Sequence, residues 1–178
     1  MKIIDAIQVI KKFDEQGRFV FTKQDLVKLF PKDRLKTFEE SLKRLLKAGV
    51  LVRACRGIYV NEQAQSKDAY LIEHVAKALR RGEYNYVSLE SILSEYGVIS
   101  QIPVSHLTIM TTGRRGTYKT PYGVIEFTHT KRPVVELLKS MRIVEKRPLR
   151  VATKAAAVRD LNRVGRNKHL LQQDEEDD

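Results

Sequence analysis

The stretch from Lys32 to Val60 constrains the fold of this chain most, because a basic helix there leads directly into a short basic hairpin. Apolar residues recur at steps of three and four along residues 32–49, which predicts a helix with one buried stripe that ends at Gly49. The sequence VLVRACRGIYV then places branched and aromatic residues on both sides of a turn at residues 55–57, which is typical of a β-hairpin. The predicted stripe consists of Leu35, Phe38, Leu42, Leu45 and Leu46.

The residues before this helix predict the other elements of a small domain. An amphipathic helix runs from Lys2 to Gly17, and RFVF at residues 18–21 is a short strand. A second helix follows, with Thr22 and Asp25 as an approximate capping box, and Pro31 stops it. Helix, strand, helix, basic helix and hairpin in this order are typical of a winged helix-turn-helix, which we expect over residues 1–62.

The charge pattern indicates that this domain binds DNA. Residues 1–62 hold 14 basic and eight acidic side chains, and the basic excess gathers on the third helix and the hairpin. In a winged helix-turn-helix that helix enters the major groove, and the hairpin contacts the neighbouring backbone. Winged helices also bind proteins, and fold alone does not give function. The candidate DNA-contacting residues are Lys32, Arg34, Lys36, Thr37, Glu40, Lys43, Arg44, Lys47, Arg53 and Arg56.

The composition of the whole chain also indicates a polyanionic partner. The formal net charge is +11, and five of the 22 acidic residues lie at Asp174–Asp178, so the rest of the chain is strongly basic. Such a charge attracts nucleic acid or an anionic membrane surface, although it can also serve solubility. No apolar run approaches the roughly 20 residues of a membrane span, and no signal-peptide segment opens the chain, so we expect a cytoplasmic protein.

Cys55 is the only cysteine, which excludes an internal disulfide framework and a cysteine-rich zinc site. Two interpretations of it stay open. The neighbouring Arg53 and Arg56 could lower the pKa of its thiol and make it redox-responsive. The other interpretation is a small half-buried hairpin residue.

A second domain is predicted over residues 66–167, after a short polar linker. Helices are expected over residues 68–82, from a Ser88 cap to Gly97, and from a Thr153 cap to Gly165. The alternating region from His106 predicts two or three antiparallel strands. The fold class is therefore α+β, with a winged helix-turn-helix followed by a small α/β domain with an antiparallel hairpin sheet. Residues 168–178 are predicted to be an acidic, disordered tail that is solvated or shields the basic surface.

The second domain carries a second basic cluster around its predicted hairpin. Tyrosines in the same domain could offer stacking platforms to single-stranded nucleic acid, or could pack a small core. The second basic cluster consists of Arg114, Arg115, Lys119, Lys131 and Arg132.

No constellation of catalytic or metal-binding residues appears in the sequence. The four histidines, His74, His106, His129 and His169, have no partners at ligand spacing, and neither HExxH nor CxxC occurs. The GRRG sequence at residues 113–116 lacks the lysine and helix of a P-loop. We therefore expect no catalysis, no metal and no cofactor.

Two segments resemble a known family. YVSLESILSEYGVISQIP from Tyr86, followed by LTIMTTGRRGTYKTPYGVIEFTHTKR, is similar to the middle domain of AbiEi-type antitoxins of bacterial abortive-infection systems. In that family a winged-helix domain comes first, so the resemblance covers roughly residues 1–160. It implies a type IV antitoxin that takes part in phage defence and represses its own operon by binding inverted repeats in the promoter. The neighbouring gene would encode an AbiEii-type nucleotidyltransferase toxin.

The resemblance also assigns roles to residues. DNA contact would fall on Lys36, Thr37, Lys43, Arg44, Lys47, Arg53 and Arg56. The antitoxic surface would lie in TTGRRGTYKTPYG and THTKR, which hold the second basic cluster. The toxin would be neutralised functionally or by direct contact, by a chain that is a monomer in solution or a weak dimer on DNA. The alternatives are a protein-interaction inhibitor that grips an acidic partner, an RNA-binding module and, last, an enzyme.

Overall fold

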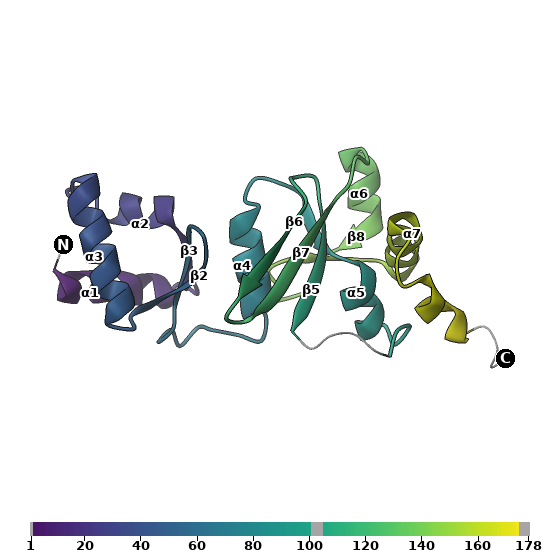
Figure 1. The fold of residues 1–178 in the computed structure, drawn as a ribbon, viewed down its shortest axis with the longest axis horizontal. Coiled ribbons are helices and arrows are strands. Elements are labelled where there is room, and N and C mark those ends of the chain that lie inside the picture. Colours follow the sequence, from purple (N-terminus) through teal and green to yellow (C-terminus); the bar gives the residue numbers. More distant parts are fainter. Residues whose placement is uncertain (1, 101–104, 175–178) are drawn as a thin grey trace. The chain divides into compact units, whose positions relative to one another are not determined.

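The computed structural model describes residues 2–100 and 105–174, with seven α-helices among them. The chain divides into two compact units, Met1–Leu79 and Arg80–Asp178 (Figure 1). Each unit has its own sheet, three-stranded in the first and six-stranded in the second. The α+β fold class is therefore confirmed.

The first unit combines four helices with a small antiparallel sheet whose strand order is β1-β3-β2. The central strand, β3, pairs with β1 through Phe21 and Tyr59 and with β2 through Val52 and Val60. In chain order the elements are α1 (Ile3–Asp14), β1 (Val20–Thr22), α2 (Lys23–Leu29), α3 (Leu35–Lys47), β2 (Leu51–Cys55), β3 (Ile58–Asn61) and α4 (Leu71–Leu79).

Local sequence accounts for the ends of these elements. The capping box at α2 is confirmed, since the Asp25 amide donates to Thr22 Oγ1 at 3.1 Å and the Thr22 amide donates to the Asp25 carboxylate at 2.8 Å. Gly57 has a φ of +80° in the turn between β2 and β3, a conformation that favours glycine. The predicted helix and hairpin therefore form where the sequence placed them.

The core of the first unit lies between its helices and its sheet. The stripe of α3 is buried at Phe38, Leu42 and Leu45, as predicted. Leu35 was predicted to belong to it but is 63% exposed, because it opens the helix and the stripe is covered only from Phe38 onward. The buried core consists of Ala6, Ile10, Phe21, Leu26, Phe38, Leu42, Leu45, Val50, Leu51 and Tyr59.

Helix α4 belongs to the first unit, although the second domain was predicted to begin at residue 66. This helix packs against β1 and β3, and the rings of Phe19 and His74 lie 4.8 Å apart in an edge contact. Val75 and Ala76 are fully buried. The division of the chain therefore falls between Leu79 and Arg80, because the apolar side of α4 covers the first sheet.

The second unit is built on a mixed sheet with strand order β6-β7-β5-β4-β9-β8. Its helix α5 packs on β5 and on α7, and α7 also packs on β9. Its elements are β4 (Asn85–Val87), α5 (Leu89–Glu95), β5 (His106–Thr111), β6 (Gly116–Thr120), β7 (Gly123–His129), α6 (Val134–Ser140), β8 (Met141–Arg142), β9 (Arg150–Ala152), α7 (Lys154–Val164) and the 3-10 helix η1 (Lys168–Asp174).

This sheet is larger than the predicted antiparallel hairpin sheet. The hairpin itself is present as β6 and β7, with Tyr118 opposite Ile125. However, β5 pairs with β7 in parallel, and β4 pairs with β9 in parallel. Strands of three residues such as β4 and β9 show no alternation, and a parallel partner is distant in sequence, so neither pairing leaves a local signal.

The end of the chain follows the prediction in part. Thr153 caps α7 by accepting a hydrogen bond from the Ala156 amide at 3.3 Å, and Gly165 ends the helix with a φ of 79°. Residues 168–174, predicted to be disordered, form η1, and the remaining tail residues lie outside the described part of the chain. Among the described helices, none is long and apolar enough to cross a membrane.

Candidate nucleic-acid surface and second-unit pocket

The ten candidate DNA-contacting side chains are all solvent-exposed in the first unit. They form what we term the cationic surface. Eight lie on α3 or immediately before it, and Arg53 and Arg56 flank the turn between β2 and β3. Because Phe38, Ser41, Leu42 and Leu45 of α3 face the core, the cations of this helix face solvent.

Few acidic groups compensate this surface. Lys43 pairs with Glu40 at 2.8 Å, and this hydrogen bond raises the pKa of Lys43 above its usual value. Glu39 pairs with Lys23, also at 2.8 Å, and the hydrogen bond from Lys23 lowers the pKa of Glu39. Within the described residues, no ion pair engages Lys32, Arg34, Lys36, Lys47 or Arg56.

Two other contacts orient the surface. Arg44 donates to Ser41 Oγ at 3.0 Å, and Arg53 Nε donates to the Cys55 carbonyl oxygen at 3.4 Å. Glu40, one of the candidate DNA-contacting residues, accepts its hydrogen bond from Lys43. Burial raises the pKa of the Cys55 thiol although Arg53 opposes the shift, which favours the half-buried hairpin role over a redox-responsive one.

The second basic cluster is only partly brought together. Arg114 and Arg115 lie in the connection from β5 to β6, and Lys131 and Arg132 follow β7. Since Gly116 pairs with Phe127, these four residues lie at the same end of the β6–β7 ladder. Lys119 lies near its other end, opposite Val124, and Arg132 is half-buried with a 3.7 Å ion pair to Glu136.

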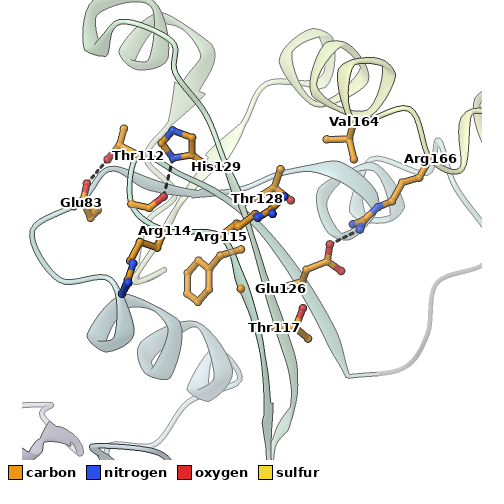
Figure 2. A pocket seen from close by; sticks show the side chains of 13 residues that line it. Glu83, Thr112, Arg114, Arg115, Thr117, Glu126, Thr128, His129, Val164 and Arg166 are labelled. Atoms are coloured by element: carbon orange, nitrogen blue, oxygen red, sulfur yellow. Dashed lines mark hydrogen bonds and ion pairs between the residues drawn. The ribbon is translucent and has the colours of Figure 1, made fainter.

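A pocket of about 1240 Å³ opens beside Arg114 and Arg115 (Figure 2). The strands β6 and β7 form its floor, and the C-terminal end of α7 supplies one wall. Figure 2 shows Arg115 and Thr128 in its middle, with Arg166 on one side and His129 on the other. It is lined by Glu83, Thr112, Gly113, Arg114, Arg115, Gly116, Thr117, Glu126, Phe127, Thr128, His129, Val164 and Arg166.

Hydrogen bonds fix one rim of this pocket. His129 Nδ1 donates to the Gly113 carbonyl oxygen at 2.8 Å, so this nitrogen carries a proton and Nε2 is left for another partner. Thr112 Oγ1 donates to the Glu83 carboxylate at 2.6 Å. A Cβ at Gly113 would lie 2.9 Å from Glu83 Cγ, so the loop needs glycine there for close packing.

An ionic network closes the opposite side. Arg166 forms ion pairs with Glu90 at 2.9 Å and with Glu126, and His106 contacts Glu126 at 3.1 Å. Burial opposes the ionisation of Glu90, but hydrogen bonds from Arg166 and Asn167 outweigh it and hold the pKa of this carboxyl below its usual value. This network lines a smaller cavity of about 170 Å³ next to the pocket.

A second buried network lies in the core of the same unit. The Tyr86 hydroxyl donates to Asp160 at 3.0 Å, and Ser88 Oγ donates to the same carboxylate at 2.9 Å. Asp160 is 1% exposed. Ser88 was predicted to cap α5, but its side chain makes no cap hydrogen bond because it is committed to Asp160.

The tyrosines considered as stacking platforms mostly pack inward. Tyr86 is fully buried, and the Tyr96 hydroxyl donates to the Ala152 carbonyl oxygen at 2.7 Å. The ring of Tyr118 meets Phe127 edge to face, with the Arg80 guanidinium 5.2 Å from its centre. Tyr84 is 40% exposed. These contacts favour the packing interpretation over recognition of single-stranded RNA by stacking.

The sequence predicted the exposed cations, but it did not predict that Glu90 and Glu126 pair with Arg166. Glu90, Glu126 and Arg166 come from three separate segments, and no spacing in the sequence relates them. The described residues hold no group of three or more histidine, cysteine, aspartate or glutamate side chains that could bind a metal ion.

No protein-family model matches this chain, and no curated protein matches its sequence at a significant level.

Proposed function

We propose that this chain is a DNA-binding transcriptional repressor and the antitoxin of a type IV toxin–antitoxin pair. The observation that carries the DNA-binding role is the cationic surface of α3 and the β2–β3 turn. The helix order and the antiparallel sheet β1-β3-β2 support a winged helix-turn-helix assignment, with α3 as the recognition helix and β2–β3 as the wing.

In this proposal, phosphate contacts supply most of the affinity. The unpaired Lys32 and Arg34 just before α3, Lys47 on α3 and Arg56 on the wing would displace counterions from the DNA backbone. Lys36, Thr37, Glu40 and Arg44 would reach base edges, with Glu40 exchanging Lys43 for a cytosine amino group. A chain that binds inverted repeats in its own promoter would act as a monomer in solution or as a weak dimer on DNA.

The antitoxic role rests on the resemblance to AbiEi-type antitoxins and on the exposed arginines of the second unit. Arg114 and Arg115 are exposed and form no ion pair with a described acidic residue, so they are available to a partner. The partner would be an AbiEii-type nucleotidyltransferase, neutralised without catalysis by this chain. Co-expression tests this role: the chain restores growth of cells that express the toxin of the neighbouring gene, and failure to restore growth contradicts it.

A mobility-shift titration tests the DNA-binding role. The full chain is titrated against the DNA upstream of its gene and against a scrambled duplex of equal length, across a series of salt concentrations. We expect preferential binding to the upstream DNA that persists at moderate salt. Equal binding to both duplexes that collapses as salt rises would mean that the cationic surface attracts any polyanion.

A specific observation favours a second candidate function, that of a protein-interaction inhibitor. Helix α6 exposes Val135 by 65% and Leu138 by 42%, and Ile143 after it is 75% exposed. Lys139 lies four residues after Val135 on the same helix and is exposed, so this face fits a protein partner with an apolar contact and an acidic rim. Co-purification of an acidic partner that is lost in a Val135→Asp variant would support this function, and retention in that variant would contradict it.

A further inference from the structure

The pocket of the second unit presents positive charge that is not neutralised within it. Arg114 and Arg115 line it without acidic partners among the described residues. The two lining carboxylates are both engaged, Glu83 by the Thr112 hydroxyl and Glu126 by Arg166 and His106. A ligand in the pocket would therefore meet the unpaired guanidinium group of Arg115, with that of Arg114 at the edge, while both lining carboxylates are already hydrogen-bonded.

Hydroxyl groups accompany these charges on one face of the sheet. Thr117 lies directly opposite Glu126 in the β6–β7 pairing, so their side chains share a face. Side chains alternate along a strand, so Thr128, two residues beyond Glu126, lies on that face as well. Arg115 lies two residues before Thr117, and Figure 2 shows it beside Thr128. The Arg115 guanidinium and the two threonine hydroxyls thus lie on a single open face, whereas Arg114 extends away from Arg115 and lines the edge of the pocket (Figure 2).

This donor set suits phosphate. A guanidinium group presents paired N–H donors that match two phosphate oxygens, and hydroxyl groups add further donors. The volume of about 1240 Å³ exceeds what an isolated phosphate ion needs and is large enough for a nucleotide. Val164 gives one wall an apolar side chain beside these polar groups.

We propose that this pocket binds the phosphates of a nucleotide, with Arg115 as the principal contact, Arg114 at the edge of the pocket and Thr117 and Thr128 as supporting donors. The nucleotide is either free or the end of a single strand. The inference does not rest on DNA binding by α3, since every residue involved belongs to the second unit. Arg114 and Arg115 also belong to the surface proposed for the antitoxic role, so the test uses the purified chain without a toxin.

Titration calorimetry on the full chain tests the proposal with three probes: ATP, inorganic triphosphate and a single strand of about ten nucleotides. The test variant is Arg114→Ala/Arg115→Ala. The matched control is Lys139→Ala/Lys154→Ala, which removes the same charge from exposed positions outside the pocket. We expect the test variant to bind about tenfold more weakly or worse, and the control to stay within about twofold of the parent chain at equal salt.

The outcomes separate the possible sources of phosphate. Binding of ATP indicates a free nucleotide, and binding of the strand alone indicates a nucleic-acid end; both support the proposal if the control retains binding. Equal weakening in the test and control variants overturns it, because the attraction would then be general charge. Absence of binding by all three probes also overturns it. A Thr117→Val variant, which keeps both arginines, should weaken binding a few-fold and leave the binding of upstream DNA by α3 unchanged.

Discussion

The two units carry basic charge in different ways. On α3 of the first unit, most basic side chains point into solvent, and the only ion pair among the ten candidate residues joins Lys43 to Glu40 within the described chain. In the second unit, several arginines are used inside the fold. Arg147 binds both carboxylate oxygens of Glu95, at 2.7 and 2.9 Å, with its side chain only 5% exposed.

This difference shows that net charge does not measure the charge that a ligand can reach. An arginine paired inside the fold contributes to folding, and where its carboxylate is buried, as that of Glu90 is beside Arg166, removal of the arginine leaves an uncompensated charge inside the protein. An exposed lysine without a partner contributes little to stability and can displace counterions from a polyanion. The contrast predicts that substitutions of the paired buried groups in the second unit mainly change stability, whereas those on α3 mainly change DNA affinity.

The largest effect is expected for Asp160→Ala. This substitution removes the buried acceptor of the Tyr86 and Ser88 hydroxyls, and unsatisfied buried groups cost about 1–3 kcal/mol each, so we expect a loss of about 3–5 kcal/mol of unfolding free energy. Urea denaturation followed by circular dichroism measures it. Lys154→Ala, at an exposed position of the same helix, is the control and should change little. A loss below about 1 kcal/mol for Asp160→Ala would contradict the expected dependence of the second unit's stability on its buried polar groups.

On the first unit, we expect Arg44→Ala to weaken binding of the upstream DNA by about 1–3 kcal/mol and to leave the unfolding free energy nearly unchanged. The reason is that Arg44 is exposed, and that its side chain forms one hydrogen bond within the described chain, to the Ser41 hydroxyl. Mobility shifts at matched salt measure the affinity, with Lys77→Ala on α4 as the control. Unchanged DNA affinity would remove Arg44 from the interface.

Acid should destabilise the second unit through Glu90. Because its pKa in the folded chain is lowered, the stabilisation from Arg166 is present above the ordinary carboxyl pKa and is lost as pH falls through the lowered pKa. We expect Glu90→Gln to lose about 1–2 kcal/mol relative to the parent chain at neutral pH, and this gap to close on acidification. Denaturation curves at several pH values measure the gap. A gap independent of pH would show that the ionised form of Glu90 adds no stability.

The smallest effect is expected for Glu40→Gln. This change frees Lys43 from its exposed ion pair, so binding to scrambled duplex should strengthen about twofold at low salt while the melting temperature stays constant. Filter binding across a salt series measures the change, with Glu15→Gln on the first unit as the matched control. A clear fall in melting temperature would place Glu40 among the structural charges instead.

Much of the first unit follows from local sequence. The spacing of Phe38, Leu42 and Leu45 orients α3, and this orientation exposes the six candidate residues that lie on the helix. The capping box at Thr22 likewise depends only on neighbouring residues. The same is true in the second unit of Gly165, which ends α7 in the αL conformation. Periodicity and capping act over a few residues, so a single sequence is enough to reveal them.

The tertiary structure decided what depends on distant residues. It placed α4 on the first sheet, set the parallel pairing of β5 with β7, and joined Arg166 to Glu90 across 76 positions. It also separated Lys119 from the other members of the second basic cluster and left Arg114 and Arg115 beside a pocket. Such contacts have no period or fixed spacing, because they arise only when separate elements pack together. The sequence by itself therefore determined which side chains are charged and how each local element forms, and packing determined which of those charges are free.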